Sequence, residues 1–249
     1  MTANRRSFNA QMLTALTSYG LLEHLFEQDL FGKEVKPIID KWMLELYSLC
    51  KDVKTQKIKD LEFQKQLEAL YSRVNLKDLL KFVELDRVKK QIKLPSLGAR
   101  STGVDLSKVE GMPKRVIFGK QIFCLKKDRS IVPHGHDNMC TGFIVLEGDF
   151  HGRHWDRVED HKDHYIIKPT IDRKFKPAES STISDHKDNV HWFKALSNSA
   201  YVFNVHVLGY NPKKSRTGRA YLDPAGEKIA GGLIKAKKMS SRECHRKYG

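Results

Sequence analysis

The sequence predicts a mainly β protein, a double-sheeted barrel or sandwich, with an α-helical N-terminal segment. Three observations support this fold class. Apolar residues recur at helical spacing over residues 8–90, whereas short strand-like runs separated by turn-rich segments follow residue 114. Proline and glycine break the pattern between the two parts. We therefore expect a helical segment at 1–94, a linker at 95–114, a barrel at 115–212 and a basic tail at 213–249 that wraps the barrel.

Four helices are expected in the first part. Leucines from Leu13 to Leu25 share one helical face, and Ile38 to Leu49 do the same behind Pro37, a residue suited to a first helical turn. A third stripe runs from Leu61 to Tyr71, and Asn75 is a candidate cap for a fourth helix through Val83. These stripes indicate packing between helices.

The barrel is expected from five apolar runs rich in β-branched and aromatic residues. Short strands at this spacing are typical of a sandwich or a barrel. The runs are Val116–Leu125, Thr141–Leu146, His164–Ile167, Val190–Ala195 and Tyr201–Leu208.

Composition narrows the class of partner. The formal net charge is +15, yet the basic residues of the tail do not alternate with aromatic ones as a base-stacking platform requires, so a nucleic-acid platform is not expected. No apolar run is long enough to span a membrane. The four cysteines form no CxxC pair, which favours a reducing, cytoplasmic location. The stretch 4–8 resembles the core of a twin-arginine signal, so periplasmic export is the alternative.

Nine of the eleven histidines fall between His134 and His206. Within this region, His134 and His136 are two residues apart, so in a strand their imidazoles point to the same face and can bind one ion. Nitrogen ligands suit iron, copper, zinc, nickel or manganese. Later in the chain, His191 follows Asn189 at the start of another strand-like run. His186 is the alternative third ligand.

These motifs, with the turn at Gly148, resemble those of the cupin superfamily over residues 115–212. The resemblance implies that the barrel is a jelly roll, the double-stranded β-helix of cupins. It also implies that His134, His136 and His191 hold a metal, and that Thr141 stands where many cupins have a glutamate ligand. Three-histidine cupins are typical of thiol dioxygenases, and the segments around His191 and Val207–Tyr210 are similar to the cysteamine and plant cysteine oxidase branch. The family therefore implies Fe(II), O2 and a small, anionic or thiol-containing substrate oxidised to a sulfinate.

Further candidate residues are less specific. His154 and Arg153, expected on the strand after Gly148, are candidates to line the pocket, and Tyr210 is a candidate hydrogen-bond donor. Arg173 could pair with a substrate carboxylate, and Thr141 could face the substrate; exposure to solvent is the alternative for Arg173.

Two other classes of function remain open at this stage. One is a metal-dependent isomerase, lyase or decarboxylase that uses nickel, zinc, manganese or copper without redox chemistry. The other is a non-catalytic binding or sensing protein. Cys140 adjoins Thr141, but a shift of one residue along a strand turns a side chain to the other face, so a Cys–Tyr cofactor is not expected.

Overall fold

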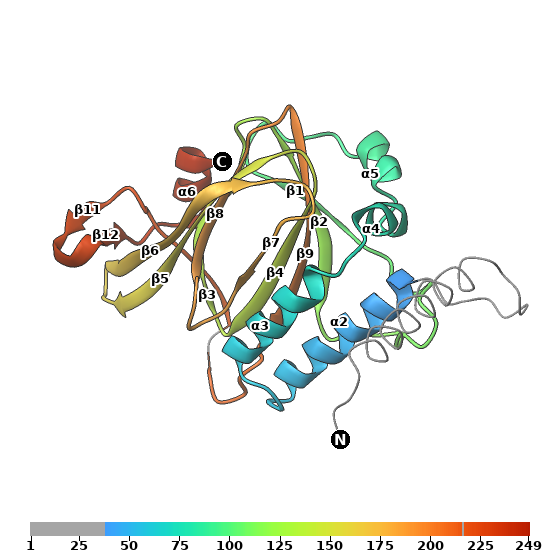
Figure 1. The fold of residues 1–249 in the computed structure, drawn as a ribbon. Helices are drawn as coiled ribbons and strands as arrows, with labels where there is room; N and C mark the ends of the chain where they lie inside the picture. The colour runs from blue at the N-terminus through green and yellow to red at the C-terminus, as the bar shows by residue number, and fades with distance from the viewer. Residues whose placement is uncertain (1–37, 216) are drawn as a thin grey trace, which may run out of the picture. The chain divides into compact units, whose positions relative to one another are not determined.

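The computed structural model describes residues 38–215 and 217–249, and residues from Ile39 onward form one compact unit. The expected first helix, Leu13 to Leu25, and the twin-arginine-like stretch lie outside the described residues. Within the unit, two antiparallel sheets form a barrel, and α-helices lie against both sheets (Figure 1).

The five-stranded sheet has, in spatial order, β1 (Arg100–Gly103), β2 (Gly119–Lys126), β9 (Ser199–Leu208), β4 (Met139–Glu147) and β7 (Ser180–Ile183). The seven-stranded sheet has β10 (Gly218–Tyr221), β3 (Ser130–Asp137), β8 (Val190–Ala195), β5 (Phe150–Asp160), β6 (His164–Phe175), β12 (Leu233–Lys237) and β11 (Glu227–Ile229). Strands β2 to β9 supply the eight strands of a jelly roll, four in each sheet. The predicted fold class, a cupin-type jelly roll with N-terminal helices, is confirmed.

A layer of helices covers the outer face of the five-stranded sheet. The helices are α2 (Ile38–Lys54), α3 (Asp60–Tyr71), α4 (Leu76–Phe82) and α5 (Leu85–Gln91). Their apolar faces share one core cluster with residues of β2, β4 and β9. The sheet is adapted to this contact at Gly142, where a Cβ atom would lie 2.5 Å from Leu67 and 2.9 Å from the Tyr71 hydroxyl. Glycine at this position therefore lets α3 lie directly on the sheet.

The interior of the barrel holds a second, aromatic cluster. Phe143, Phe150, Phe175 and Phe193 pack there with ring centroids between 5.1 and 6.3 Å apart in the contacting pairs. The hairpin between β4 and β5 turns at Gly148, which has a φ of 75° and would clash through a Cβ with the Ser199 carbonyl oxygen at 2.5 Å. This is the turn that the sequence motif indicates.

The C-terminal segment adds strands to the barrel. Strand β10 pairs with β3, and β12 pairs with β6. A short 3-10 turn at Ala230–Gly232 separates β11 from β12, and helix α6 (Ser241–Tyr248) packs on β3 behind a capping box of Ser240 and Glu243. These strands are only three to five residues long and rich in lysine and arginine. Their apolar pattern is therefore faint, which explains why the sequence indicated a tail.

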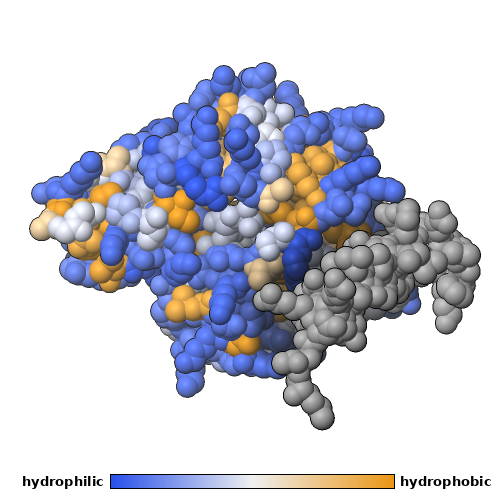
Figure 2. Space-filling model, viewed as in Figure 1, coloured by the Kyte–Doolittle hydropathy of each residue, from blue (hydrophilic) through white to orange (hydrophobic). Residues whose placement is uncertain are grey.

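No helix among the described residues is long and apolar enough to cross a membrane. On the face seen in Figure 2, hydrophilic residues cover most of the surface, and hydrophobic residues form smaller, separate areas.

Candidate metal centre

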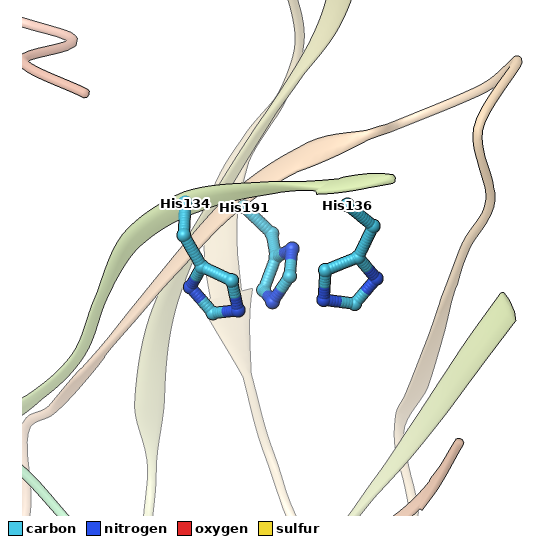
Figure 3. Close-up of side chains that lie close together, drawn as sticks. All are labelled: His134, His136 and His191. Atoms are coloured by element: carbon cyan, nitrogen blue, oxygen red, sulfur yellow. The ribbon is translucent and has the colours of Figure 1, made fainter. Parts of the chain in front are cut away.

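Three histidines meet inside the barrel. His134 and His136 lie on the same face of β3, and His191 on β8 is the register partner of His134 (Figure 3). Their ring centroids are 4.2 Å (His134–His191), 4.8 Å (His136–His191) and 5.2 Å (His134–His136) apart. All three residues are buried, with exposed fractions of 4% for His134, 2% for His136 and 0% for His191. The alternation of side chains along β3 and the pairing of β3 with β8 thus bring the three imidazoles together.

The nitrogen atoms of the three rings are arranged as ligands. One nitrogen from each ring lies within 4.8 Å of the other two. The Nδ1 atom of His134 is 2.8 Å from the Val132 carbonyl oxygen, to which it donates, and Nδ1 of His136 is 3.3 Å from the Thr141 hydroxyl. The Nε2 atoms of His134 and His136 make no hydrogen bond to any residue that the structure describes. Neither nitrogen of buried His191 has a hydrogen-bond partner among the described residues.

A buried polar atom without a partner costs about 1–3 kcal/mol. A divalent cation shared by the three rings would satisfy one of the two unpartnered nitrogens of His191, together with the Nε2 atoms of His134 and His136. The contacts at the Nδ1 atoms of His134 and His136 are of the kind that orient ligating histidines. The residues present therefore fit a transition metal.

The electrostatic environment keeps the three rings neutral. Burial lowers the pKa of His134 to about 3, and it lowers the pKa values of His136 and His191 well below the ordinary value. The positive charge of Arg219 lowers all three pKa values further. Since a metal ligand must be unprotonated, the folded chain presents these histidines in the ligating form.

Asn189 holds the two ligand-bearing strands together. Its side-chain Nδ2 donates to the carbonyl oxygens of His136 at 2.8 Å and Ser184 at 3.0 Å, and its Oδ1 accepts from the His136 amide at 3.3 Å. This side chain passes next to Gly135, where a Cβ atom would lie 2.7 Å from Oδ1. Gly135 and Asn189 therefore fix the spacing between the histidine pair and the start of β8.

The three histidines open onto a cavity of about 230 Å³. That volume is equivalent to about eight water molecules at roughly 30 Å³ each, so it suits a small ligand. Apolar side chains form part of the wall and polar ones the rest; the lining residues are Ala99, Phe123, Ser130, Ile131, Val132, His134, His136, Met139, Thr141, Phe143, His191, Asn204, His206, Arg219, Tyr221 and His245.

Of the other residues singled out in the sequence, the cavity includes only Thr141, which lies beside His136. Cys140 points the other way and is buried in the cluster under the helices, as the alternation predicts. Tyr210 is buried in that same cluster and does not line the cavity. His186, the alternative ligand, instead contacts Asp60 through Nδ1 at 2.6 Å.

The structure separates the adjacent candidates Arg153 and His154. His154 points into the barrel, 0% exposed, with its ring centroid 6.4 Å from that of His191, but it lies outside the cavity lining. Arg153 points outward to Asp172 and the Trp192 ring. Arg173 also lies outside the cavity lining, pairs with Glu179 at 2.8 Å and lies over the Phe175 ring. Consecutive residues of a strand face opposite sides, so Arg153 and His154 cannot both face the interior.

Four ionisable residues that line the cavity were not singled out in the sequence analysis: His206, Arg219, Tyr221 and His245. His206 is the register partner of Thr141, and its Nδ1 lies 3.2 Å from Asn204 Oδ1. The other three belong to the segment assigned to the tail. The i, i+2 spacing of Arg219 and Tyr221 was the available signal, since two such residues share one face of a strand.

No protein-family model matches the sequence, and no curated protein matches it. Solved structures resemble parts of the fold. An 11S globulin from Wrightia tinctoria is 13% identical over 51% of this chain and 28% of its own, with a TM-score of 0.34. An oxalate oxidase in complex with glycolate is 15% identical over 51% of this chain and 56% of its own, with a TM-score of 0.36. A cupin superfamily protein from Desulfitobacterium hafniense is 11% identical over 47% of this chain and 83% of its own, with a TM-score of 0.31.

The chain thus spans 28% and 56% of the length of the first two of these proteins. Identities and TM-scores this low do not indicate what this chain binds or catalyses. Its own topology and side chains define a cupin-type jelly roll with a candidate three-histidine metal centre at the wall of a small cavity.

Proposed function

We propose that this chain is a non-haem iron dioxygenase that oxidises the sulfur of a small thiol to a sulfinate. The observation that carries the proposal is a donor set of three neutral imidazoles beside a cavity, with the hydroxyl of Thr141, and no carboxylate, among the lining residues. Ferrous iron, when bound, would supply the redox chemistry that joins dioxygen to sulfur. Both oxygen atoms of one O2 end on the sulfur, so the overall reaction needs no external reductant.

The ligand set favours a substrate that brings a negative charge. Neutral imidazoles leave a divalent cation its full charge, whereas a carboxylate ligand would remove one unit of it. A nearby cation lowers the pKa of a thiol and favours its thiolate. Because Thr141 is a poor ligand, the three histidines leave room on the cavity side for such a group.

The rest of the cavity wall would position the substrate and limit the access of water. Met139, Phe143 and Ile131 supply apolar surface next to the histidines. The Thr141 hydroxyl contacts His136 at Nδ1 and so orients that ring. Together these side chains would hold a small thiol near the three imidazoles in a partly dry environment, where charge interactions are stronger than in water.

The experiment is oxygen uptake by the iron-loaded protein. Anaerobic protein is loaded with ferrous iron and mixed with a panel of small thiols, and oxygen consumption is followed together with the mass of the product. The proposal predicts uptake with at least one thiol and a product heavier by the two atoms of O2. The His191→Ala variant, treated in the same way, should show neither.

The alternative is a non-redox metal enzyme, because three imidazoles also suit zinc, nickel, manganese or copper. The absence of thiol-dependent uptake in protein that retains its iron would contradict the dioxygenase proposal. It would favour a lyase, isomerase or decarboxylase in which the ion acts as a Lewis acid.

A further inference from the structure

We propose that the cavity contains a second subsite, centred on Arg219, which binds an anionic group of the substrate. The proposal deepens the proposed function, on which it rests for the sulfur end of the ligand. It assigns the substrate class as a small thiol that also bears a carboxylate or a sulfonate.

The position of Arg219 follows from the pairing of β10 with β3. Arg219 is the register partner of His136, and Tyr221 is that of His134. Directly opposed residues of an antiparallel pair project to the same face, with Cβ atoms about 4.5–5.5 Å apart. Arg219 therefore shares the cavity face with the histidine pair. It is also exposed to solvent, which places it where the cavity opens.

The charge of Arg219 is not balanced locally. In residues 38–215 and 217–249, the structure gives Arg219 no ion pair and no side-chain hydrogen bond, and no aspartate or glutamate lines the cavity. Other arginines of the barrel differ in this respect. Arg153 pairs with Asp172, Arg157 with Asp137, and Arg173 with Glu179.

Arg219 lines the same cavity as the three histidines and His206. An uncompensated cation in a cavity with partly apolar walls concentrates anions. The guanidinium fork matches the two oxygens of a carboxylate or a sulfonate. The volume of about 230 Å³ allows only a short chain between that group and the sulfur.

The experiment compares two thiols that differ in one charge, 3-mercaptopropionate and its amide. Their binding to the purified protein is measured by calorimetry without oxygen, so no turnover is needed. Wild type should bind the acid about tenfold more tightly than the amide, at the lower end of the range for a charge-assisted hydrogen bond. Arg219→Gln should bind the two equally, and Arg219→Lys should keep part of the preference.

The matched control is Arg73→Gln, which removes an exposed arginine that pairs with Glu45 on the helical layer. It should keep the wild-type preference. Circular dichroism and thermal melting confirm that each variant is folded. The proposal is overturned if wild type does not prefer the acid, or if Arg219→Gln keeps that preference.

The two proposals fail separately. A wild-type protein that prefers the acid through Arg219 but consumes no oxygen would contradict the dioxygenase function and support the subsite. A protein that oxidises both thiols with equal KM, unchanged in Arg219→Gln, would contradict the subsite and support the dioxygenase function.

Discussion

The buried His154 side chain should make the folded protein sensitive to acid. Its ring is wholly buried, stacks on Phe175 with centroids 6.2 Å apart, and lies 3.2 Å through Nε2 from the Ser181 hydroxyl. Burial, and to a smaller extent the charge of Arg173, lowers the pKa of His154 to about 3. In the unfolded chain a histidine has a pKa of about 6.5.

The sign of the effect follows from these two pKa values. Below about pH 6.5 the unfolded chain takes up a proton at His154, whereas the folded chain does not do so until about pH 3. The stability that the neutral ring provides is therefore complete above about pH 6.5 and is lost as the pH falls towards about 3. The loss is about 1.4 kcal/mol per pH unit, or about 2 kcal/mol between pH 7 and pH 5.

The assay is urea unfolding of the metal-free protein at about pH 7 and about pH 5. His154→Gln keeps a polar partner for Ser181 but cannot titrate. The free energy of unfolding of this variant should fall by about 2 kcal/mol less than that of wild type over the same interval. If both proteins lose the same free energy, His154 is not held as a neutral buried ring and the reasoning is refuted.

Three further changes test the site. Gly135→Ala places a Cβ 2.7 Å from Asn189 Oδ1, so it should lower the free energy of unfolding by about 1–3 kcal/mol and weaken metal binding. Thermal melting and metal titration measure the two effects. The control is Gly103→Ala, which has nothing within 4 Å of its Cβ and should change neither quantity. Thr141→Glu should keep the metal but lower thiol-dependent oxygen uptake at equal iron loading, and equal rates would show that substrate does not use that side of the site. Arg173→Gln should leave the KM for an anionic thiol unchanged, because Arg173 does not line the cavity. A KM increase as large as that of an Arg219 variant would show that the substrate does not bind in this cavity.

The part of the site that the sequence indicated depends on strand alternation. His134 and His136 share a face because they are two residues apart, and Cys140 and Thr141 face opposite sides because they are adjacent. Alternation alone also shows that Arg153 and His154 diverge, but not which of them faces inward. That choice is fixed by Phe150 and Gly152, the inward-facing residues that precede His154 on β5.

The missing part depends on pairing between distant segments. Arg219 and Tyr221 join the cavity because β10 adds to the edge of β3, about 85 residues away in sequence. A four-residue strand carries too little hydrophobic pattern to be recognised from sequence. Tyr210, by contrast, lies just past the end of β9 but turns to the helical side of the sheet, where apolar contacts with the helices bury it.

The most direct test of the account is metal stoichiometry. The protein is loaded anaerobically with ferrous iron, passed over a desalting column and analysed for bound metal, in wild type and in the His134→Ala, His136→Ala and His191→Ala variants. The account predicts a single ion per wild-type chain and loss of most of it in each variant. Full occupancy in His191→Ala, or no retained ion in wild type, would contradict the three-histidine centre.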